Sequence, residues 1–547
     1  MQALRATRLH ALAGYLALER AFDAAFGSHL NPLRHLGALG FLLLWLLVAS
    51  GIYLYVMLDT SAAGAYRSID QLSRAPWYFG GVLRSVHRYA TDAFIVVMLV
   101  HLLREALLGR YSGFRRFSWL TGVPLLLLAF TSAIGGFWLN WDQLGQFSAT
   151  ATAELLDRLP LFAAPLTRNF LSTAAVSDRL FSLFVFVHLG VPLLLVFGLW
   201  FHIQRIARAA VFPPRPLAIG TALTLLALAL AAPVTSQAPA DLAVVPALLR
   251  YDWLLLFVHP LAYATSPAFV WALLAAALFV LFALPFLPQP AAAPIAVVDA
   301  ANCNGCRRCF DDCPYEAVTM VPHPRSRKRR AAPSFLAPPR GDGRREAAAL
   351  EAPLSVRQMA QVNADLCASC GICVGACPSS TPFRSVAKLV TGIDMPSAPI
   401  GTLRRQLTQG LAAMGDAPHK IVVFGCDHGA DVTQLADRDV AAFSLMCTGQ
   451  LPPSFVEYAL RDGAAGALVS TCREGGCAFR LGERWTAERL QGTREPHLRA
   501  AVPRDRFALV RAGAGDEGAV RAALQGLRER LATSVVPPAI QTVPAHG

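Results

Sequence analysis

The first 302 residues contain no cysteine, and this absence divides the chain in two. All 12 cysteines lie further on, in three groups of four at 303–313, 367–377 and 426–477. No thiol is left over for a structural disulfide, as expected of metal ligands in a reducing compartment. The chain also lacks a Cys-x-x-Cys-His motif, which excludes covalently attached haem.

Charged residues are scarce, and lysine is almost absent. Asp, Glu, Lys and Arg make up 16% of the chain, against 54% for hydrophobic residues. The net charge is +13, but the basic residues are nearly all scattered arginines, so the composition does not favour nucleic-acid binding. No cleavable signal peptide is expected in 1–35, where arginines stand without an apolar core before a cleavage site.

Long apolar runs fill the chain before residue 290, and each is long enough to cross a hydrocarbon core of ~30 Å. We therefore expect an all-α membrane domain over 1–290. The segment 251–264 is expected to form a partly buried helix rather than a span. Six spans are predicted, at about 36–57, 84–107, 119–140, 180–206, 216–233 and 266–287.

The charges of the connecting loops predict the orientation of these spans. The N-terminus and the connections 107–118 and 205–215 are rich in arginine, whereas the opposite loops carry aspartates and a glutamate. Basic loops stay on the cytoplasmic side of a membrane. Six spans with the N-terminus inside place everything after residue 290 in the cytoplasm, and a bacterial inner membrane is the expected location.

Two pairs of histidines stand in the apolar half at one repeated spacing. The members of each pair are 14 residues apart, which is ~21 Å along a helix and close to four turns, so both point to one face. Two such helices side by side would present one histidine couple near each membrane surface, as six-coordinate b-type haems need. The predicted couples are His87 with His188 for an outer haem, and His101 with His202 for a cytoplasmic-side haem.

Glycines repeat this spacing, and arginines flank the histidines of the second span. Glycine is costly inside a helix unless something approaches the backbone closely, so each glycine is expected beside a porphyrin face. Arg84 and Arg104 are expected beside haem propionates. The glycines are Gly37 and Gly51 in the first span, and Gly122 and Gly136 in the third. With His-Leu-Asn-Pro at 29–32, these features resemble cytochrome b of the bc-type complexes over about residues 28–287.

This resemblance implies a quinone site on the outer side. The segment 141–150 is similar to the one that lines the family's outer quinone pocket, so Trp141 and Gln143 are expected beside quinone. The segment 251–254 reads Tyr-Asp-Trp-Leu where the family has Pro-Glu-Trp-Tyr. Asp252 is predicted to exchange a quinone proton, because ionisable groups at such places are usually functional. The alternative for Asp252 is a helix cap.

Two cysteine runs follow a linker rich in proline and alanine. Each run reads Cys-x2-Cys-x2-Cys-x3-Cys-Pro, and they begin at Cys303 and Cys367. The pattern resembles the bacterial two-cluster ferredoxins over about 295–385, in which three cysteines of one run and the fourth of the other hold each [4Fe–4S] cluster. A zinc site is the alternative, but the repeated fourth Cys-Pro has no role there. The implied ligand sets are Cys303, Cys306, Cys309 and Cys377 for one cluster, and Cys367, Cys370, Cys373 and Cys313 for the other.

We expect this α+β ferredoxin domain over 295–395, with an insertion at about 322–356. The insertion is rich in Arg, Pro and Ala, a composition that favours a flexible loop. A solvated loop is the simpler interpretation, and contact with lipid headgroups or an acidic partner is the alternative.

From about 417 the pattern changes to strands alternating with helices, and thiols gather at the strand ends. Strands are predicted at 421–424, 441–446 and 466–471, with a helix at about 453–463. This order indicates a small α/β domain with a parallel sheet over 417–535. Four convergent thiolates suit a [2Fe–2S] cluster, and they are Cys426, Cys447, Cys472 and Cys477.

This last region resembles the small iron–sulfur (delta-type) subunit of methyl-viologen-reducing hydrogenases over about 418–530. The matching pieces are Phe-Gly-Cys, Met-Cys-Thr-Gly and Cys-Arg-Glu-Gly-Gly-Cys. The family usually has a second cysteine three residues after the first, where this chain has Gly429. Either the four cysteines suffice or His428 substitutes, and a redox-inert domain with buried thiols is the alternative.

Together these parts predict a relay through [2Fe–2S], two [4Fe–4S] clusters, the cytoplasmic-side haem, the outer haem and quinone. The chain has no nucleotide-binding glycine fingerprint and no flavin motif, although a two-electron donor needs such a cofactor. We expect a membrane-anchoring electron-transfer subunit of a quinone oxidoreductase, fed by a cytoplasmic flavin-containing or heterodisulfide-reductase-type partner. The alternatives are reverse flow from quinol to a low-potential acceptor, and a redox sensor or scaffold. A homodimer through the cytochrome b part is a further hypothesis.

Overall fold

The chain forms two compact units, Met1–Pro290 and Ala291–Gly547, in the computed structural model. The insertion expected at 322–356 lies almost entirely outside the described residues. Both cysteine runs and the α/β part belong to the second unit. The structure describes residues 2–75, 77–161, 163–171, 175–204, 209–246, 248–287, 294–324, 357–380 and 389–533.

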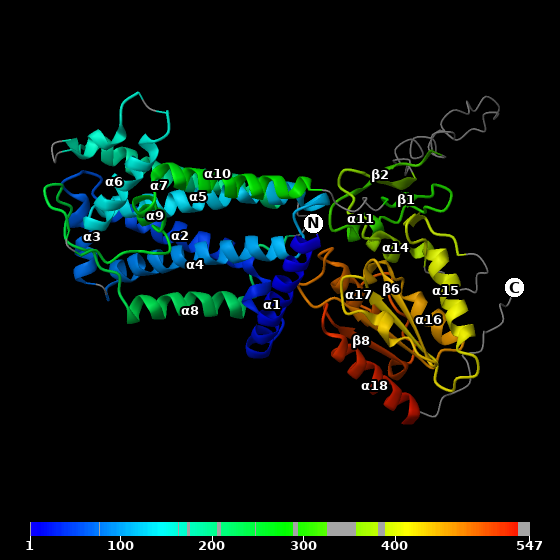
Figure 1. Ribbon diagram of the computed structural model, residues 1–547. Helices are drawn as coiled ribbons and strands as arrows, with labels where there is room; N and C mark the ends of the chain where they lie inside the picture. Colours follow the sequence, from blue (N-terminus) through cyan, green and yellow to red (C-terminus); the bar gives the residue numbers. More distant parts are fainter. Residues whose placement is uncertain are drawn as a thin grey trace, which may run out of the picture. The chain divides into compact units, whose positions relative to one another are not determined.

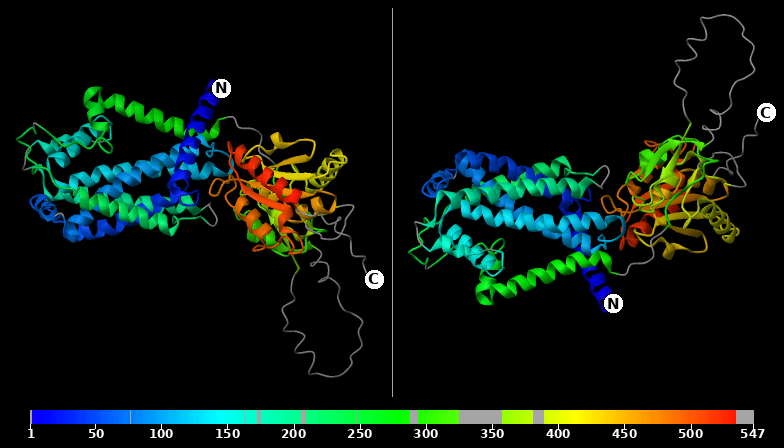
Figure 2. Two further views of the ribbon diagram at one scale, coloured as in Figure 1. Left: turned by 90° about the horizontal axis from the view of Figure 1, so that it is seen from below. Right: turned by 90° about the horizontal axis from the view of Figure 1, so that it is seen from above.

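The first unit is helical, and four of its long helices run alongside one another (Figures 1 and 2). Within this bundle α2 packs chiefly against α4, and α5 against α7. Helices α3, α6 and α9 gather at one end, and α1 crosses near the other (Figure 1). The helices are α1 (Gln2–Phe26), α2 (Leu36–Met57), α3 (Ala65–Arg74), α4 (Phe79–Leu107), α5 (Arg116–Asn140), α6 (Gln143–Asp157), α7 (Asp178–Gln204), α8 (Arg215–Ala231), α9 (Val258–Ala264) and α10 (Pro267–Ala283).

Helices lie over all the predicted spans, but they differ in how well they suit a membrane. Among the described residues, four are long and apolar enough to cross one: Leu36–Met57, Gly113–Asn140, Asp178–Gln204 and Pro267–Phe286. Helix α4 has 29 residues but carries several charged side chains, and α8 has 17 residues. The partly buried helix expected at 251–264 is the 7-residue α9.

The bundle buries only the side chains that its helices turn toward each other. Leu43, Ile95 and Leu195 are buried in one cluster from α2, α4 and α7. Large apolar side chains such as Ile52 and Phe186 stand exposed on the outside of the same helices. Helices that are apolar on every side are typical of membrane spans.

The second unit contains a four-stranded parallel sheet in the order β6-β5-β7-β8. Its strands are β5 (Ile421–Cys426), β6 (Val440–Leu445), β7 (Gly466–Thr471) and β8 (Phe507–Arg511). β5 and β7 are buried throughout, which agrees with parallel strands covered on both faces. The predicted α/β region is confirmed, and β8 is a strand that the sequence did not predict.

Helices cover both faces of this sheet because side chains alternate along each strand. On β5, Val422 and Phe424 pack in one core with α15 (Ile400–Ala413) and α16 (Ser454–Arg461). Ile421 and Val423 point to the other face and pack with α18 (Glu517–Thr533).

The cysteine runs fold as two similar halves beside the sheet. Each run ends in a short helix, α11 (Arg308–Asp312) in the first and α14 (Ile372–Ala376) in the second. Two antiparallel strand pairs accompany them: β2 (Val318–Pro322) with β3 (Gln358–Val362), and β1 (Val297–Val298) with β4 (Ile393–Asp394). One hydrophobic core continues from this part into the α/β part, so the two regions expected as separate domains pack together.

Candidate redox centres

The four membrane histidines lie on two helices of the bundle, two on α4 and two on α7. The ring centroids of His87 and His188 are 6.3 Å apart. This separation leaves room for one metal atom between two imidazole nitrogens, because metal–imidazole bonds are about 2 Å long. His101 and His202 lie further along the same helices, where His101 faces Gly37 of α2 and His202 faces Gly122 of α5.

Each repeated glycine lies against one of these histidines. A Cβ on the glycine would meet the imidazole ring at 3.2 Å for Gly51 and His87, 3.0 Å for Gly136 and His188, 3.1 Å for Gly122 and His202, and 3.6 Å for Gly37 and His101. The structure places the edge of a histidine ring beside each glycine, and the expected porphyrin face at these positions stays a prediction. The glycines therefore set how closely α2 approaches α4, and α5 approaches α7.

Hydrogen-bond partners orient three of the rings through Nδ1. A partner at Nδ1 fixes the ring and leaves Nε2 free for a metal. The partners are Ser50 Oγ for His87 at 2.9 Å, the Ser132 carbonyl for His188 at 2.9 Å, and Thr121 Oγ1 for His202 at 3.1 Å. Sequence reasoning missed these residues, although Ser50-Gly51 and Thr121-Gly122 form a repeated hydroxyl–glycine pair that could have identified two of them.

A cavity of about 490 Å³ lies beside the first histidine couple. Its walls include His87 and His188, and it extends to Tyr251 and Asp252. The volume is in the range of ligand-binding sites, which is about 300–1,000 Å³. One continuous space thus joins the couple to the segment predicted to handle quinone.

Arg84 lines this cavity, and none of its described hydrogen-bond acceptors carries a charge. Its side chain is buried, and it donates to Asn140 Oδ1 and Ser236 Oγ at 3.1 Å each and to Ser73 Oγ. These partners are neutral, but the Asp142 carboxylate lines the same cavity, accepts a hydrogen bond from Asn140 and offsets part of the charge of Arg84. The guanidinium can still attract an anionic group such as a propionate, because no carboxylate among the described residues contacts it directly.

Arg104 has a different environment from the one we expected, because two carboxylates of the chain contact it. Its Nε lies 3.0 Å from Glu19 Oε1 of α1, and its Nη1 lies 3.4 Å from Glu105 Oε1. Glu105 also pairs with Arg110 and Arg115 at 3.4 and 3.3 Å. Because carboxylates of the chain already balance Arg104, the structure gives no support to its predicted contact with a propionate.

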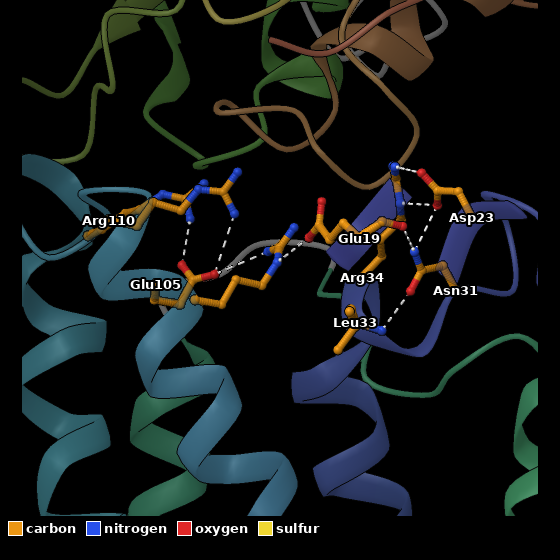
Figure 3. Close-up of polar contacts among 9 residues, drawn as sticks. Glu19, Asp23, Asn31, Leu33, Arg34, Glu105 and Arg110 are labelled. Atoms are coloured by element: carbon orange, nitrogen blue, oxygen red, sulfur yellow. Dashed lines mark hydrogen bonds and ion pairs between the residues drawn. The ribbon is translucent and has the colours of Figure 1, made fainter. Parts of the chain in front are cut away.

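The His-Leu-Asn-Pro segment fixes α1 to the bundle at this end. The Asn31 side chain is fully buried and donates to the Glu19 carbonyl at 2.9 Å and to Asp23 Oδ1 at 2.8 Å. Arg34 forms an ion pair with the same Asp23 at 2.7 Å (Figure 3). The segment thus positions Glu19 for its contact with Arg104.

Of the three residues predicted to contact quinone, Asp252 alone is among those that line the described cavity. Asp252 accepts a hydrogen bond from the Leu255 backbone N–H at 2.8 Å within a turn. Helix α9 begins only at Val258 and its N-cap is Phe257, so the alternative role of Asp252 as a helix cap is wrong for this helix. Asp252 also forms an ion pair with Arg88. Trp141 ends α5 and packs its ring on Phe181, with centroids 5.3 Å apart.

Gln143 begins α6, and its backbone N–H donates to the Ala238 carbonyl at 2.9 Å. This contact joins α6 to the segment that follows α8. Gln143 is therefore placed by the structure beside the chain that frames the cavity rather than on its wall.

The structure brings the cysteines of the two runs together in two mixed sets. One small cavity is lined by Cys303, Cys306, Cys309 and Cys377, and another by Cys313, Cys367, Cys370 and Cys373. Each set takes three thiols from one run and the fourth from the other. Burial raises the pKa of the Cys309 thiol to about 12, so a bound metal must supply the charge that deprotonates it.

The last four cysteines converge where the parallel strands end. Cys426 ends β5, while Cys447 and Cys472 follow β6 and β7, and all four thiols are buried. The sulfurs of Cys472 and Cys426 are 3.5 Å apart. The carboxyl edge of a parallel sheet is where such folds bind ligands, and this thiol set suits an iron–sulfur cluster.

Neither departure from the hydrogenase pattern adds a ligand. His428 is exposed and packs its ring against Phe479, with centroids 5.2 Å apart. A side chain at Gly429 would begin 3.0 Å from the Ala512 carbonyl, which leaves little space for a fifth cysteine. The structure thus gathers the four thiols without the His428 ring, and their role as a complete ligand set stays a prediction.

Comparison with family models assigns three segments of the chain. Residues 22–209 match cytochrome b (cytochrome b/b6/petB), residues 302–381 match the 4Fe-4S dicluster domain, and residues 421–533 match the delta subunit of methyl-viologen-reducing hydrogenase. The three matches agree in order and position with the predicted fusion. We call the matched parts the cytochrome b, dicluster and delta segments.

One solved structure illustrates the similarity. A chain of "Hyperthermophilic respiratory Complex III" is 19% identical, with a TM-score of 0.38, and the match covers 46% of this chain and 75% of that one. The family models themselves establish a membrane electron-transfer subunit. The cytochrome b segment implies haem, and the dicluster segment implies [4Fe–4S] clusters.

Proposed function

We propose that this chain carries electrons between a cytoplasmic flavin-containing partner and the quinone of a bacterial inner membrane. The observation that carries the proposal is the His87–His188 couple, whose ring centroids are 6.3 Å apart beside a cavity that also contains Asp252. The bound groups would be two b haems, two [4Fe–4S] clusters, one [2Fe–2S] cluster and a quinone substrate.

The haem-binding roles rest on the histidines and their neighbours. His87 and His188 would hold one haem, and His101 and His202 the other, each group moving a single electron when bound. Ligation from both faces leaves no open position for oxygen. Arg84 is placed to bind a propionate of the first haem, because its present partners are neutral.

The quinone role rests on Asp252 and Arg88. Asp252 lines the cavity and can take up or release the proton that accompanies quinone chemistry. Arg88 pairs with Asp92 as well as Asp252, so it keeps one counter-charge when Asp252 is protonated. Trp141, at the end of α5, and Gln143, at the start of α6, do not line the described part of the cavity.

The iron–sulfur roles follow the cysteine sets. The two mixed sets of the dicluster segment would hold the [4Fe–4S] clusters, and the four thiols of the delta segment a [2Fe–2S] cluster. We place both segments in the cytoplasm, where a flavin-containing subunit would split electron pairs for one-electron carriers.

Cofactor content tests the proposal on full-length protein purified without oxygen. We expect two non-covalent haem b groups per chain by absorbance, and ten iron atoms in clusters after haem correction. The iron number follows from 12 cysteines used without remainder. Haem well below two, or cluster iron well below ten, contradicts the corresponding part.

Direction is tested separately, by redox titration of all centres. Cluster potentials below those of the haems favour flow toward quinone, and the opposite order favours reduction of a cytoplasmic acceptor by quinol. Failure of every centre to react with quinone or with a low-potential donor leaves the sensor or scaffold.

A further inference from the structure

The two cysteine runs share a backbone but differ in what surrounds them. In the first run the residues between the second and third cysteines are Arg307 and Arg308, and the neighbouring Cys306 is exposed. In the second run they are Gly371 and Ile372, and both are buried. Arg307 and Gly371 correspond in position and have similar φ values, 65° and 73°. The two runs therefore differ in which parts of the protein pack over them.

The delta segment supplies the cover over the second run. A Cβ on Gly371 would meet the Gln450 side chain at 3.0 Å, and a Cβ on Gly375 would meet the Gly449 carbonyl oxygen at 2.2 Å. Any larger side chain at these positions would push η8 (Thr448–Gln450) away from α14. The second run thus has glycine where the delta segment comes closest.

A single apolar side chain fills the space between the two cysteine sites. The Cβ position of Gly482, at the start of α17 (Gly482–Gln491), lies 2.2 Å from Cys447 Sγ and 3.4 Å from Cys477 Sγ. The same point lies 3.6 Å from Ile372 Cδ1. Ile372 is fully buried and stands between Cys370 and Cys373 in the chain, so its side chain lies between the second run and the start of α17, which borders Cys447.

One buried guanidinium joins the elements around this contact. Arg489 of α17 donates to Asp312 Oδ2 at 2.5 Å and to the Gly449 carbonyl at 2.9 Å. It also donates to the Ile372 carbonyl at 3.4 Å. Its side chain is 1% exposed. Arg489 therefore connects both cysteine runs to the delta segment.

The position of this charge matters for both sites. Asp312 directly precedes Cys313, which belongs to the second cysteine set. Burial lowers the pKa of Arg489, and the charges of Asp312 and of a Cys447 thiolate act in the opposite direction. Its Nε is buried and has no hydrogen-bond partner among the described residues. Net charge and hydrogen bonds to sulfur are what set cluster potentials.

We propose that the set Cys313, Cys367, Cys370 and Cys373, rather than the other mixed set, exchanges electrons directly with the delta segment, and that Arg489 is the positioning residue that holds and tunes this junction. The inference rests on the proposed iron–sulfur occupancy. One electron leaves the reduced centre of the delta segment, which is oxidised, and reduces the neighbouring centre. No bond or proton changes. The other mixed set, which includes the exposed Cys306, then comes second in the order of electron transfer.

Electron paramagnetic resonance on the full-length, reduced protein tests this order. Neighbouring reduced clusters split each other's signals, so we expect splitting of the [2Fe–2S] signal in the wild type. Cys370→Ser should abolish the splitting, while Cys306→Ser, in the other set, should leave it unchanged. The reverse result, or clusters without splitting in the wild type, overturns the junction. A wild type with no cluster signals contradicts the proposed function instead.

Charge substitutions test the role of Arg489. Arg489→Met should lower the midpoint potential of the coupled [4Fe–4S] cluster. The expected shift is a tenfold change in the oxidised-to-reduced ratio at a given potential, which is about 59 mV for one electron. Asp312→Asn should raise it, because a negative charge is removed. Arg489→Lys should keep the potential near that of the wild type.

The matched control is Arg484→Gln on the same helix, whose side chain is 63% exposed and which should shift nothing. If Arg489 had a purely structural role, Arg489→Met and Asp312→Asn would not shift the cluster potential in opposite directions. Potential shifts of the same sign in both variants, or no shift in either, therefore overturn the proposed role of Arg489. If Arg489→Met fails to retain its clusters, the sign of the Asp312→Asn shift still decides.

Discussion

The two ends of the membrane unit differ in how their arginines are neutralised. At the His87 end, Arg84 lines a large cavity and its hydrogen-bond partners are neutral. At the His101 end, Arg104 is paired with Glu19 and with its neighbour on α4. Each arginine stands three residues from a histidine of the same helix, yet their surroundings are opposite.

The comparison teaches that spacing along a helix places a charge but does not choose its partner. A cation beside a ligand histidine is available to a cofactor only when no carboxylate of the chain reaches it first. At the His101 end, α1 supplies that carboxylate. Among the described residues, the first arginine has carboxylates nearby but none in direct contact, whereas the second is in direct contact with Glu19.

The largest expected effect comes from removing one couple at a time. His188→Ala should eliminate the haem at the His87 end and leave the other, since the ligands pair by depth. His202→Ala should do the converse. Each variant should lose about half of the dithionite-reduced haem b absorbance, and the two residual spectra should add up to the wild type. Retention of all haem in either variant contradicts the pairing.

The second-largest effect should come from replacing each arginine by a neutral residue, and it should differ between the two ends. Arg104→Gln leaves the buried carboxylate of Glu19 without its cation, which costs roughly 3–5 kcal/mol, and the protein should unfold at a clearly lower temperature in detergent. Arg84→Gln should change the unfolding temperature little but weaken haem retention at the His87 end and lower that haem's potential. Equal effects of the two substitutions on stability would remove the distinction between the ends.

Proton exchange should depend on the His87 end alone. Asp252→Asn should slow quinone reduction by about 100-fold, the usual size of a general acid–base contribution, with both haem spectra unchanged. Asp23→Asn, at the other end, serves as the matched control and should leave the rate unaltered. Rate measurements with a soluble short-chain quinone check this, and equal rates in wild type and Asp252→Asn refute the proton role.

The smallest effect should come from the glycines. In Gly136→Ala the new Cβ would lie 3.0 Å from His188, so the ring must shift by a few tenths of an ångström and the haem potential should change. In Gly37→Ala the nearest ring atom is 3.6 Å away, an ordinary contact. Redox titration should show a shift in the first variant and almost none in the second.

Helix periodicity made much of the membrane site predictable. The 14-residue spacing alone places His87 opposite His188, because both helices repeat with the same period. The contact of Glu19 with Arg104 was not predictable, since it joins residues 85 positions apart through a helix that crosses the bundle. The same holds for Ser132, which reaches His188 through its backbone carbonyl and leaves no mark in the sequence.

In the second unit, motif spacing predicted which cysteines meet, because the pattern encodes a local fold. It did not predict the packing of the delta segment on the second run. Gly371 and Gly375 have no room for a side chain because Gly449 and Gln450, about 75 residues further along the chain, pack against them. The strand β8 was missed because its burial is only partial and it ends in the exposed Arg511.

The division of one polypeptide into a membrane unit and an iron–sulfur unit has a kinetic consequence. Partners on separate chains must find each other by diffusion, at a rate that falls with dilution. Units joined covalently meet at a fixed effective concentration, which for short connections is in the millimolar range. If the proposed relay operates, electron exchange between the two units of this chain would be first-order, and its rate would not depend on how much protein the membrane contains.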